Sequence, residues 1–256
     1  MQMFYRALAL SFVLITHSLA GLEHECQVNV PQDVWAKLTP YFLPNDHCIK
    51  NKLDTLFSSP DVLKNENSLK KNGFKLAGAR GYSKALVLKH KKLKKYLLKV
   101  FTDDQIGIVE YEIWMRRVDG SHAVSSAIER HGFQKIFKVP KKWIYQVPRN
   151  GNSFEEKNFV LIVEDMEIYD NRGNSIMWNS LEYVTKEKLN ALYTILKEVG
   201  LKDSIYIDNI PFSLDGRIAF VDTDHFYQWP VPYSRLKPAL AIKMQDYWTG
   251  LILRDP

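Results

Sequence analysis

The sequence has little of what marks several common protein classes. It contains only two cysteines among 256 residues, Cys26 and Cys48, which excludes a scaffold held by many disulfides. Its seven histidines form no His-x-x-x-His or His-Glu-x-x-His pattern, so the common zinc motifs are absent. There is no Gly-x-Ser-x-Gly elbow of a serine hydrolase, no internal repeat and no low-complexity tract. The remaining composition, with 46% hydrophobic and 25% charged residues, is typical of a globular protein with a full core.

Long apolar runs are also scarce, and the one near the start is too short for a membrane-spanning helix. Residues 1–20 combine a basic start, an apolar centre from Ala7 to Ile15 and a small-x-small end, Ser-Leu-Ala. These features predict a secretory signal peptide, and hence an exported protein, periplasmic or secreted, without a transmembrane anchor after cleavage. In an oxidising compartment Cys26 and Cys48 favour a single disulfide, with two free or buried thiols as the alternative.

The formal net charge is +6, and the densest cationic segment runs from Lys89 to Lys95. We expect it to be the exposed tip between two strands, Ala85 to Leu88 and Tyr96 to Phe101, where lysines discourage edge pairing. A second interpretation is weak contact with an anionic surface. No nucleic-acid-binding motif accompanies the run, so nucleic acid is not expected as a partner.

Turn residues and hydrophobic periodicity divide the rest of the chain into three parts. Residues 21–70 contain several prolines and indicate an irregular and helical N-terminal extension. Residues 71–166 show the alternation of a small antiparallel sheet. Residues 167–256 contain one helical stretch and one hairpin. The fold class expected is therefore α+β.

Three helices can be placed from local signals. Two are expected after the first strands, over residues 104–118 and 121–130, with Asp119-Gly120 separating them. The third begins where Thr185 can cap it and ends at Gly200, with apolar residues on one face between them.

The most informative segment runs from Gly200 to Asp224 and gathers acidic residues at one end of a short hairpin. A loop with Asp203, Asp208 and Asn209 precedes one strand, an Asp-Gly turn reverses the chain, and the second strand leads to Asp222. Mg²⁺ takes such hard oxygen ligands from one or two carboxylates and leaves positions for water and phosphate. Turn formation and capping are the local alternative for Asp and Asn in loops.

This hairpin resembles the catalytic hairpin of the protein-kinase-like superfamily, in particular its aminoglycoside and choline phosphotransferase branch. The family has an Asn, a strand, a turn, a second strand and a metal-binding Asp in this order, as from Asn209 to Asp222 here. The resemblance implies ATP and Mg²⁺ as cofactors, with Asp222 and either Asp208 or Asn209 as metal ligands. It implies Asp203 as the residue that orients or deprotonates a hydroxyl acceptor. The family has this Asp at the position of Ser204, usually after a His, so the loop departs from the pattern.

The resemblance extends from about Phe74 to Phe226 and implies a two-lobed kinase-like fold, with a small antiparallel N-lobe sheet and a reduced, mostly helical C-lobe. Gly78 and Gly81 would lie in the turn that covers the phosphates, where missing side chains admit an anion. Lys99, on the third strand, would hold phosphate. It shares a strand face with apolar neighbours, so it requires an anionic partner.

Two further roles follow from the resemblance. The lysine's partner in the family is a glutamate on the next helix, for which Glu129 is preferred here and Glu112 is the alternative. The apolar run that ends in Glu164 to Met166 would lead into the hinge, whose backbone binds adenine. A plain strand end with polar termini is the alternative for this segment.

The sequence as a whole predicts a divergent, exported kinase-like protein that binds ATP and Mg²⁺. If active, it would transfer a phosphoryl group to an unknown hydroxyl-bearing small molecule or protein. Because Asp203 is displaced and no His precedes it, the alternative is an inactive pseudokinase that acts as a secreted binding module.

Overall fold

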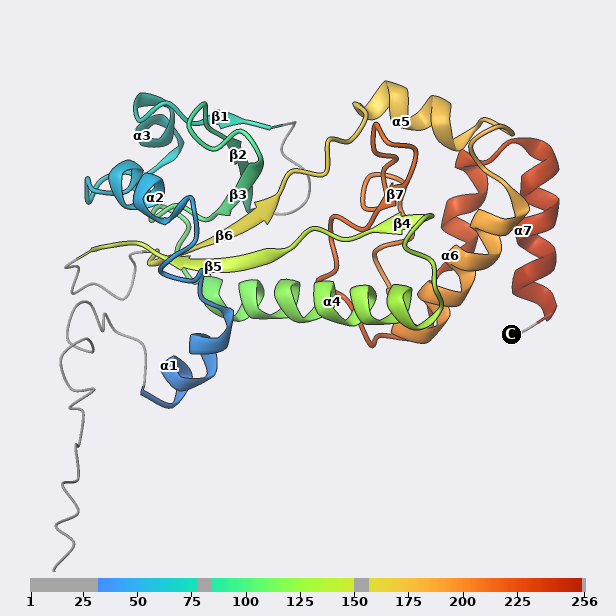
Figure 1. Cartoon of the computed structure of the whole chain (residues 1–256), viewed down its shortest axis with the longest axis horizontal. Coiled ribbons are helices and arrows are strands. Elements are labelled where there is room, and N and C mark those ends of the chain that lie inside the picture. Colours follow the sequence, from blue (N-terminus) through green and yellow to red (C-terminus); the bar gives the residue numbers. More distant parts are fainter. Residues whose placement is uncertain (1–31, 78–83, 150–156, 255–256) are drawn as a thin grey trace, which may run out of the picture.

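The computed structural model of the chain describes residues 32–77, 84–149 and 157–254. The expected signal peptide, Cys26, Gly78 and Gly81 lie outside the described residues. Within them the protein is α+β, with a sheet in the earlier part and helices gathered in the later part (Figure 1). None of the helices in the described part of the chain has the length and hydropathy needed to cross a membrane.

Five strands form one sheet in the order β1-β2-β3-β6-β5, and every pair of neighbours is antiparallel. The strands are β1 (Lys75–Leu76), β2 (Leu86–Lys89), β3 (Tyr96–Val100), β5 (Lys142–Gln146) and β6 (Phe159–Glu164). The antiparallel sheet predicted from the sequence is thus confirmed. Its register places Lys99 of β3 between Val87 of β2 and Leu161 of β6, on the central strand.

Helices cover both faces of this sheet (Figure 1). On one face, α2 (Lys50–Leu56) and α3 (Glu66–Lys71) share a buried cluster with β3 and β6. On the other face lie α1 (Gln32–Leu38), the 3₁₀ helix η1 (Thr39–Tyr41) and α4 (Glu110–Arg130). Because successive side chains of a strand point to opposite faces, β6 is buried almost throughout. The helices expected in a separate extension over residues 21–70 therefore belong to the core around the sheet.

A second core lies in the later part of the chain. It is formed by α5 (Asn171–Trp178), α6 (Lys186–Val199), the 3₁₀ helix η2 (Tyr233–Ala239) and α7 (Ile242–Arg254). Two short parallel strands, β4 (Phe137–Lys138) and β7 (Ile218–Ala219), pair beside these helices. The end of α4 also contributes Val124, Ala127 and Ile128 to this core. The same helix therefore packs against one face of the sheet and against the second core.

The break predicted at Asp119-Gly120 is wrong, because α4 runs without interruption from Glu110 to Arg130. Gly120 is present for a different reason. A Cβ atom at this position would lie 1.8 Å from the carbonyl oxygen of Thr223, so the chain after the hairpin crosses the helix where a side chain is absent. A helix tolerates one glycine at a cost of about 1 kcal/mol relative to alanine. The packing partner is distant in sequence and leaves no local signal.

The cationic segment from Lys89 to Lys95 forms the tip between β2 and β3, as predicted. Lys91, Lys92, Lys94 and Lys95 are exposed, whereas Lys89 pairs with Asp165 at 3.2 Å. The tip therefore ends the sheet in solvent, and its contact with an anionic surface stays a prediction.

Cys48 is an exposed, free thiol just before α2, so the disulfide expected between Cys26 and Cys48 is not formed. The Cys48 side chain interacts instead with the hydroxyl of Tyr96 on β3. The free-thiol alternative therefore holds for Cys48.

The helix expected between Thr185 and Gly200 is confirmed as α6. The Thr185 side chain accepts a hydrogen bond from the Lys188 amide at 3.2 Å, and Gly200 ends the helix with a left-handed φ of 61°.

Thr185→Ala should lower the free energy of unfolding by about 1 kcal/mol, because the first turn loses its cap. Chemical denaturation of both proteins measures this difference. Thr194→Ala is the control within α6, because its hydroxyl only returns to the Asn190 carbonyl. It should be neutral or slightly stabilising.

Candidate functional site

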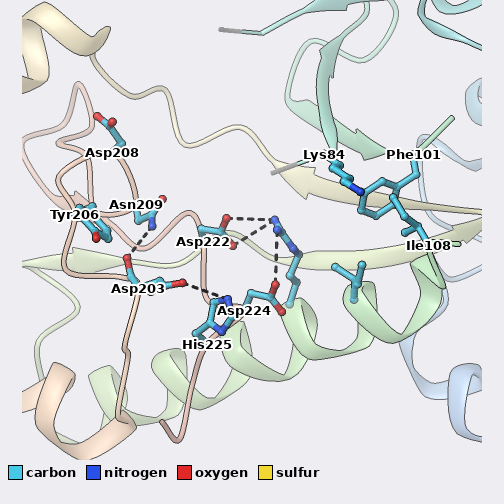
Figure 2. A pocket seen from close by; sticks show the side chains of 12 residues that line it. Lys84, Phe101, Ile108, Asp203, Tyr206, Asp208, Asn209, Asp222, Asp224 and His225 are labelled. Carbon is cyan, nitrogen blue, oxygen red and sulfur yellow. Dashed lines mark hydrogen bonds and ion pairs between the residues drawn. The ribbon is translucent and has the colours of Figure 1, made fainter. Parts of the chain in front are cut away.

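A cavity of about 960 Å³ opens between α4, the end of the sheet and the hairpin. Its apolar lining consists of Phe101, which follows β3, Ile108, which precedes α4, and Ile113 of α4. Its hairpin side is polar and carries several of the residues singled out from the sequence (Figure 2). The polar part of the lining consists of Lys84, Arg117, Asp203, Tyr206, Asp208, Asn209, Asp222, Asp224 and His225.

The hairpin predicted from the sequence is formed and brings two of its polar residues together. The Ser213 amide donates to the Arg217 carbonyl at 2.8 Å across the turn, and Phe212 and Ile218 form an antiparallel bridge. Further along, the Val221 amide donates to the Asn209 carbonyl at 3.0 Å. This register places Asn209 beside the residue that follows Val221, which is Asp222.

Asp208 and Asn209 differ in where they point. Asp208 is exposed, and its carboxylate points away from Asp222, whereas Asn209 lies next to Asp203 and nearer to Asp222 (Figure 2). The Asn209 side-chain amide donates to the Asp203 carbonyl at 2.8 Å. The register of the hairpin thus favours Asn209 over Asp208 as the neighbour of Asp222.

Ser204 explains the departure from the kinase-like pattern at Asp203. Its buried hydroxyl donates to the Asp222 carbonyl at 2.6 Å and ties the loop to the end of the hairpin. The preceding residue, Asp203, keeps a half-exposed side chain at the cavity. Nε2 of His225 lies 3.2 Å from Oδ2 of Asp203. A histidine does accompany Asp203, but it follows the hairpin instead of preceding the loop.

Cations surround Asp222. Lys99 Nζ lies 3.7 Å from its carboxylate, and the Arg117 guanidinium of α4 lies 3.3 Å away. Burial alone would raise the pKa of Asp222, but Lys99, Arg117 and Lys142 together hold it well below its ordinary value. Asp222 is therefore a carboxylate at neutral pH.

Lys99 projects from the sheet toward α4, on the face predicted from the strand alternation. Burial lowers the pKa of Lys99 from 10.5 to about 8, against the opposite effect of Asp222. Its ion-pair partner is Asp222, which corrects the expectation of a glutamate. Glu112 is exposed, and Glu129 is exposed about three turns beyond Arg117, too far along α4 to reach the lysine.

Sequence reasoning missed Arg117, whose side chain is 7% exposed and contacts both Asp222 and Asp224. The signal was available. Trp114, Arg117, Val118 and Ser121 recur at helical spacing on one buried face of α4, so a charged residue interrupts an apolar stripe. Such a residue requires a buried partner of opposite charge.

Lys142 of β5 was missed as well. Its buried ammonium donates to the Arg117 carbonyl at 3.2 Å and to the Thr223 hydroxyl at 3.0 Å. Burial and the nearby Lys99 lower the pKa of Lys142 well below its ordinary value. Lys142 thus joins the sheet, α4 and the chain after the hairpin at one point.

The segment expected to be a hinge has other contacts. The Glu164 carboxylate accepts the Lys141 amide at 3.0 Å, and the Met166 carbonyl accepts the Ser213 hydroxyl at 2.7 Å. Neither residue belongs to the lining of the cavity. Lys99 is absent from this lining as well, so the lining does not decide where adenine would bind. Glu164 and Met166 anchor the connection between sheet and hairpin, and their role in binding adenine stays a prediction.

The oxygen-bearing groups near Asp222 fit Mg²⁺ only if water and phosphate supply further ligands. In the described ranges no three His, Cys, Asp or Glu side chains lie close enough to hold a metal among themselves. Oδ1 of Asp222 is nevertheless buried without a hydrogen-bond partner, and Asn209 lies beside this residue. Carboxylate and amide oxygens are ligands that Mg²⁺ accepts, with water and phosphate completing the octahedron. The site thus fits Mg²⁺ bound together with phosphate.

The comparisons with known proteins leave the family open. No protein family matches the sequence. No curated protein matches it either. One solved structure that matches is the complex of Rv3197 with erythromycin from Mycobacterium tuberculosis, with 14% sequence identity and a TM-score of 0.35. The match covers 79% of this chain and 58% of that protein, so the chain spans less than two thirds of its length.

Proposed function

We propose that this protein binds a nucleoside triphosphate with Mg²⁺ at the cavity and transfers the terminal phosphoryl group to a hydroxyl acceptor. The observation that supports the proposal best is the meeting of Lys99, Asn209 and Asp222, which come from a strand and a hairpin far apart in the chain. A lysine on the third strand, with an Asp and an Asn for metal, is the set of groups that kinases use. A two-lobed kinase-like arrangement and export are parts of the same proposal.

Each side chain has a defined role in the proposed reaction. Asn209 and Asp222 would hold the metal, and Lys99 would contact phosphate oxygens. Bound Mg²⁺ would supply neutralisation of the phosphate charge. Asp203, half-exposed at the cavity, would orient the acceptor hydroxyl and accept its proton. The bond from the acceptor oxygen to the γ-phosphorus forms while the bond to the leaving nucleoside diphosphate breaks.

Asp203→Asn tests this mechanism. We expect the rate of ATP turnover to fall by about 10²- to 10⁴-fold. The rate is measured as release of ADP or phosphate, with water or a mixture of hydroxyl-bearing metabolites as acceptor. Nucleotide affinity should stay nearly unchanged, because Asp203 contacts the acceptor and not the phosphates. Equal turnover in both proteins would remove Asp203 from the mechanism.

Asp208→Asn is the matched control, since it makes the same change five positions away on an exposed side chain that points away from Asp222. Turnover and nucleotide affinity should both stay close to those of the unaltered protein. A loss of turnover equal to that of Asp203→Asn would mean that Asp208 carries the role assigned here to its neighbours.

A second candidate function is that of an inactive binding module. Two observations favour it: Arg117 and Lys99 already neutralise Asp222, and His225 pairs with the Asp203 carboxylate. Saturable nucleotide binding, without detectable ATP turnover whichever acceptor is supplied, would establish this second function. Turnover that depends on Asp203 would exclude it.

A further inference from the structure

The helix that faces Lys99 carries a cation where the kinase-like resemblance implies an anion. Arg117 of α4 lies 3.3 Å from the Asp222 carboxylate, and Lys99 lies 3.7 Å from the same group. The Arg117 side chain is 7% exposed and lines the cavity. One carboxylate is thus shared by two cations, and α4 adds positive charge where the family has a negative one.

The two cations at Asp222 favour an added anion beside them. Lys99 and Arg117 share the Asp222 carboxylate, and Arg117 also lies 3.8 Å from Asp224. Asp203 and Asp208 line the cavity as well, so the attraction for an anion is confined to the part next to Arg117. Beside Lys99 and Arg117 a metal ion on its own would be repelled, whereas a triphosphate would be attracted.

The contacts of Arg117 leave donor capacity for a ligand. Its separations from Asp222 and Asp224, 3.3 and 3.8 Å, are longer than the 2.7–2.9 Å typical of charge-assisted hydrogen bonds. Its Nε is buried without a hydrogen-bond partner, and so is Oδ1 of Asp222. A buried donor without an acceptor is costly, and phosphate oxygens match the planar guanidinium.

We propose that Arg117 is a direct phosphate ligand and that, with Lys99, it lets this site bind a nucleoside triphosphate in the absence of a divalent metal. The inference rests on the proposed nucleotide site and deepens it. Metal would then be required for phosphoryl transfer but not for binding. Arg117 takes over part of the charge neutralisation that Mg²⁺ provides to a bound triphosphate.

The test measures the affinity of the full-length protein for ATP and for inorganic tripolyphosphate by calorimetry, once with excess MgCl₂ and once with excess EDTA. We expect the unaltered protein to bind ATP in EDTA within about tenfold of its affinity with Mg²⁺. Arg117→Gln should lower the affinity in EDTA by about 10- to 100-fold, the usual value of a hydrogen bond to a charged group. Tripolyphosphate should follow ATP, since the contact is to phosphate.

Asp222→Asn and Arg116→Gln make the result specific. Asp222→Asn removes a negative charge, so it should raise the affinity for ATP in EDTA and reduce the benefit of Mg²⁺. Arg116→Gln is the matched control: the neighbouring arginine is exposed and does not line the cavity, and affinity should change less than about twofold. Arg117→Lys keeps the charge and should retain most of the metal-free binding even if Arg117→Gln folds poorly, which circular dichroism would reveal.

Two outcomes would overturn the inference alone: ATP binding that requires Mg²⁺ in the unaltered protein, or Arg117→Gln and Arg116→Gln with equal affinities in EDTA. In both cases the nucleotide site itself would stand. Absence of ATP binding in either buffer would overturn the proposed function together with the inference.

Discussion

Gly120→Ala is expected to destabilise the protein by about 3 kcal/mol or more, at the upper end of the range for overpacked sites. The added Cβ would lie 1.8 Å from the Thr223 carbonyl oxygen and 2.9 Å from its carbon, so main-chain atoms would have to move. A flexible side chain could rotate away, but here both α4 and the crossing chain must separate. Urea denaturation of the two proteins measures the difference in the free energy of unfolding.

Gly250→Ala is the control for this change. Gly250 lies inside α7, and no atom lies within 4 Å of the position of its Cβ. The substitution should be neutral or stabilising by up to about 1 kcal/mol, because alanine is the better helix former. If Gly120→Ala unfolded at the same denaturant concentration as Gly250→Ala, the close crossing of α4 and Thr223 would be refuted.

Saturating ATP with Mg²⁺ should stabilise the protein, and Lys99→Met should abolish most of this effect. A ligand that binds only the folded state adds about 2.7 kcal/mol at 100 times its dissociation constant. For a chain of this size that corresponds to a rise in melting temperature of roughly 5–10 °C. Lys99→Met removes the phosphate contact, so the rise in melting temperature should largely disappear.

Without ligand, Lys99→Met should change the free energy of unfolding in two opposing ways. A methionine avoids the cost of burying the Lys99 charge, whose pKa burial lowers to about 8, but Asp222 loses one of the cations that pair with it. Lys95→Met is the control, because Lys95 is exposed at the tip just before the same strand. Its ligand-induced shift should be unchanged. A full shift in Lys99→Met would remove the lysine from the phosphate site.

The parts of this protein that follow from the sequence are those governed by nearby residues. Alternation along the strands predicted the antiparallel sheet and the face of Lys99, since side chains alternate within one strand. Thr185 and Gly200 defined α6 because capping requires only the adjacent turn. The Asp-Gly turn likewise defined the hairpin that carries Asp222.

Within the site, the sequence found the acidic loop and the lysine but not what lies between them. Asn209 and Asp222 carry recognisable spacing because one hairpin holds both, whereas Asp203 lies in the preceding loop, one position from the expected one. Which glutamate would pair with Lys99 could not be decided, because the answer depends on how α4 crosses the sheet. That crossing presents Arg117, and it leaves both proposed glutamates exposed.

Composition, helix caps, strand alternation and the hairpin were determined by the sequence alone, because each depends on interactions within a few residues. Only the tertiary structure decided that Gly120 serves a close crossing, that His225 meets Asp203, and that Arg117 and Lys99 share Asp222. These contacts join segments far apart in the chain. Their geometry is fixed by the packing of α4 between the two hydrophobic cores, which no local pattern records.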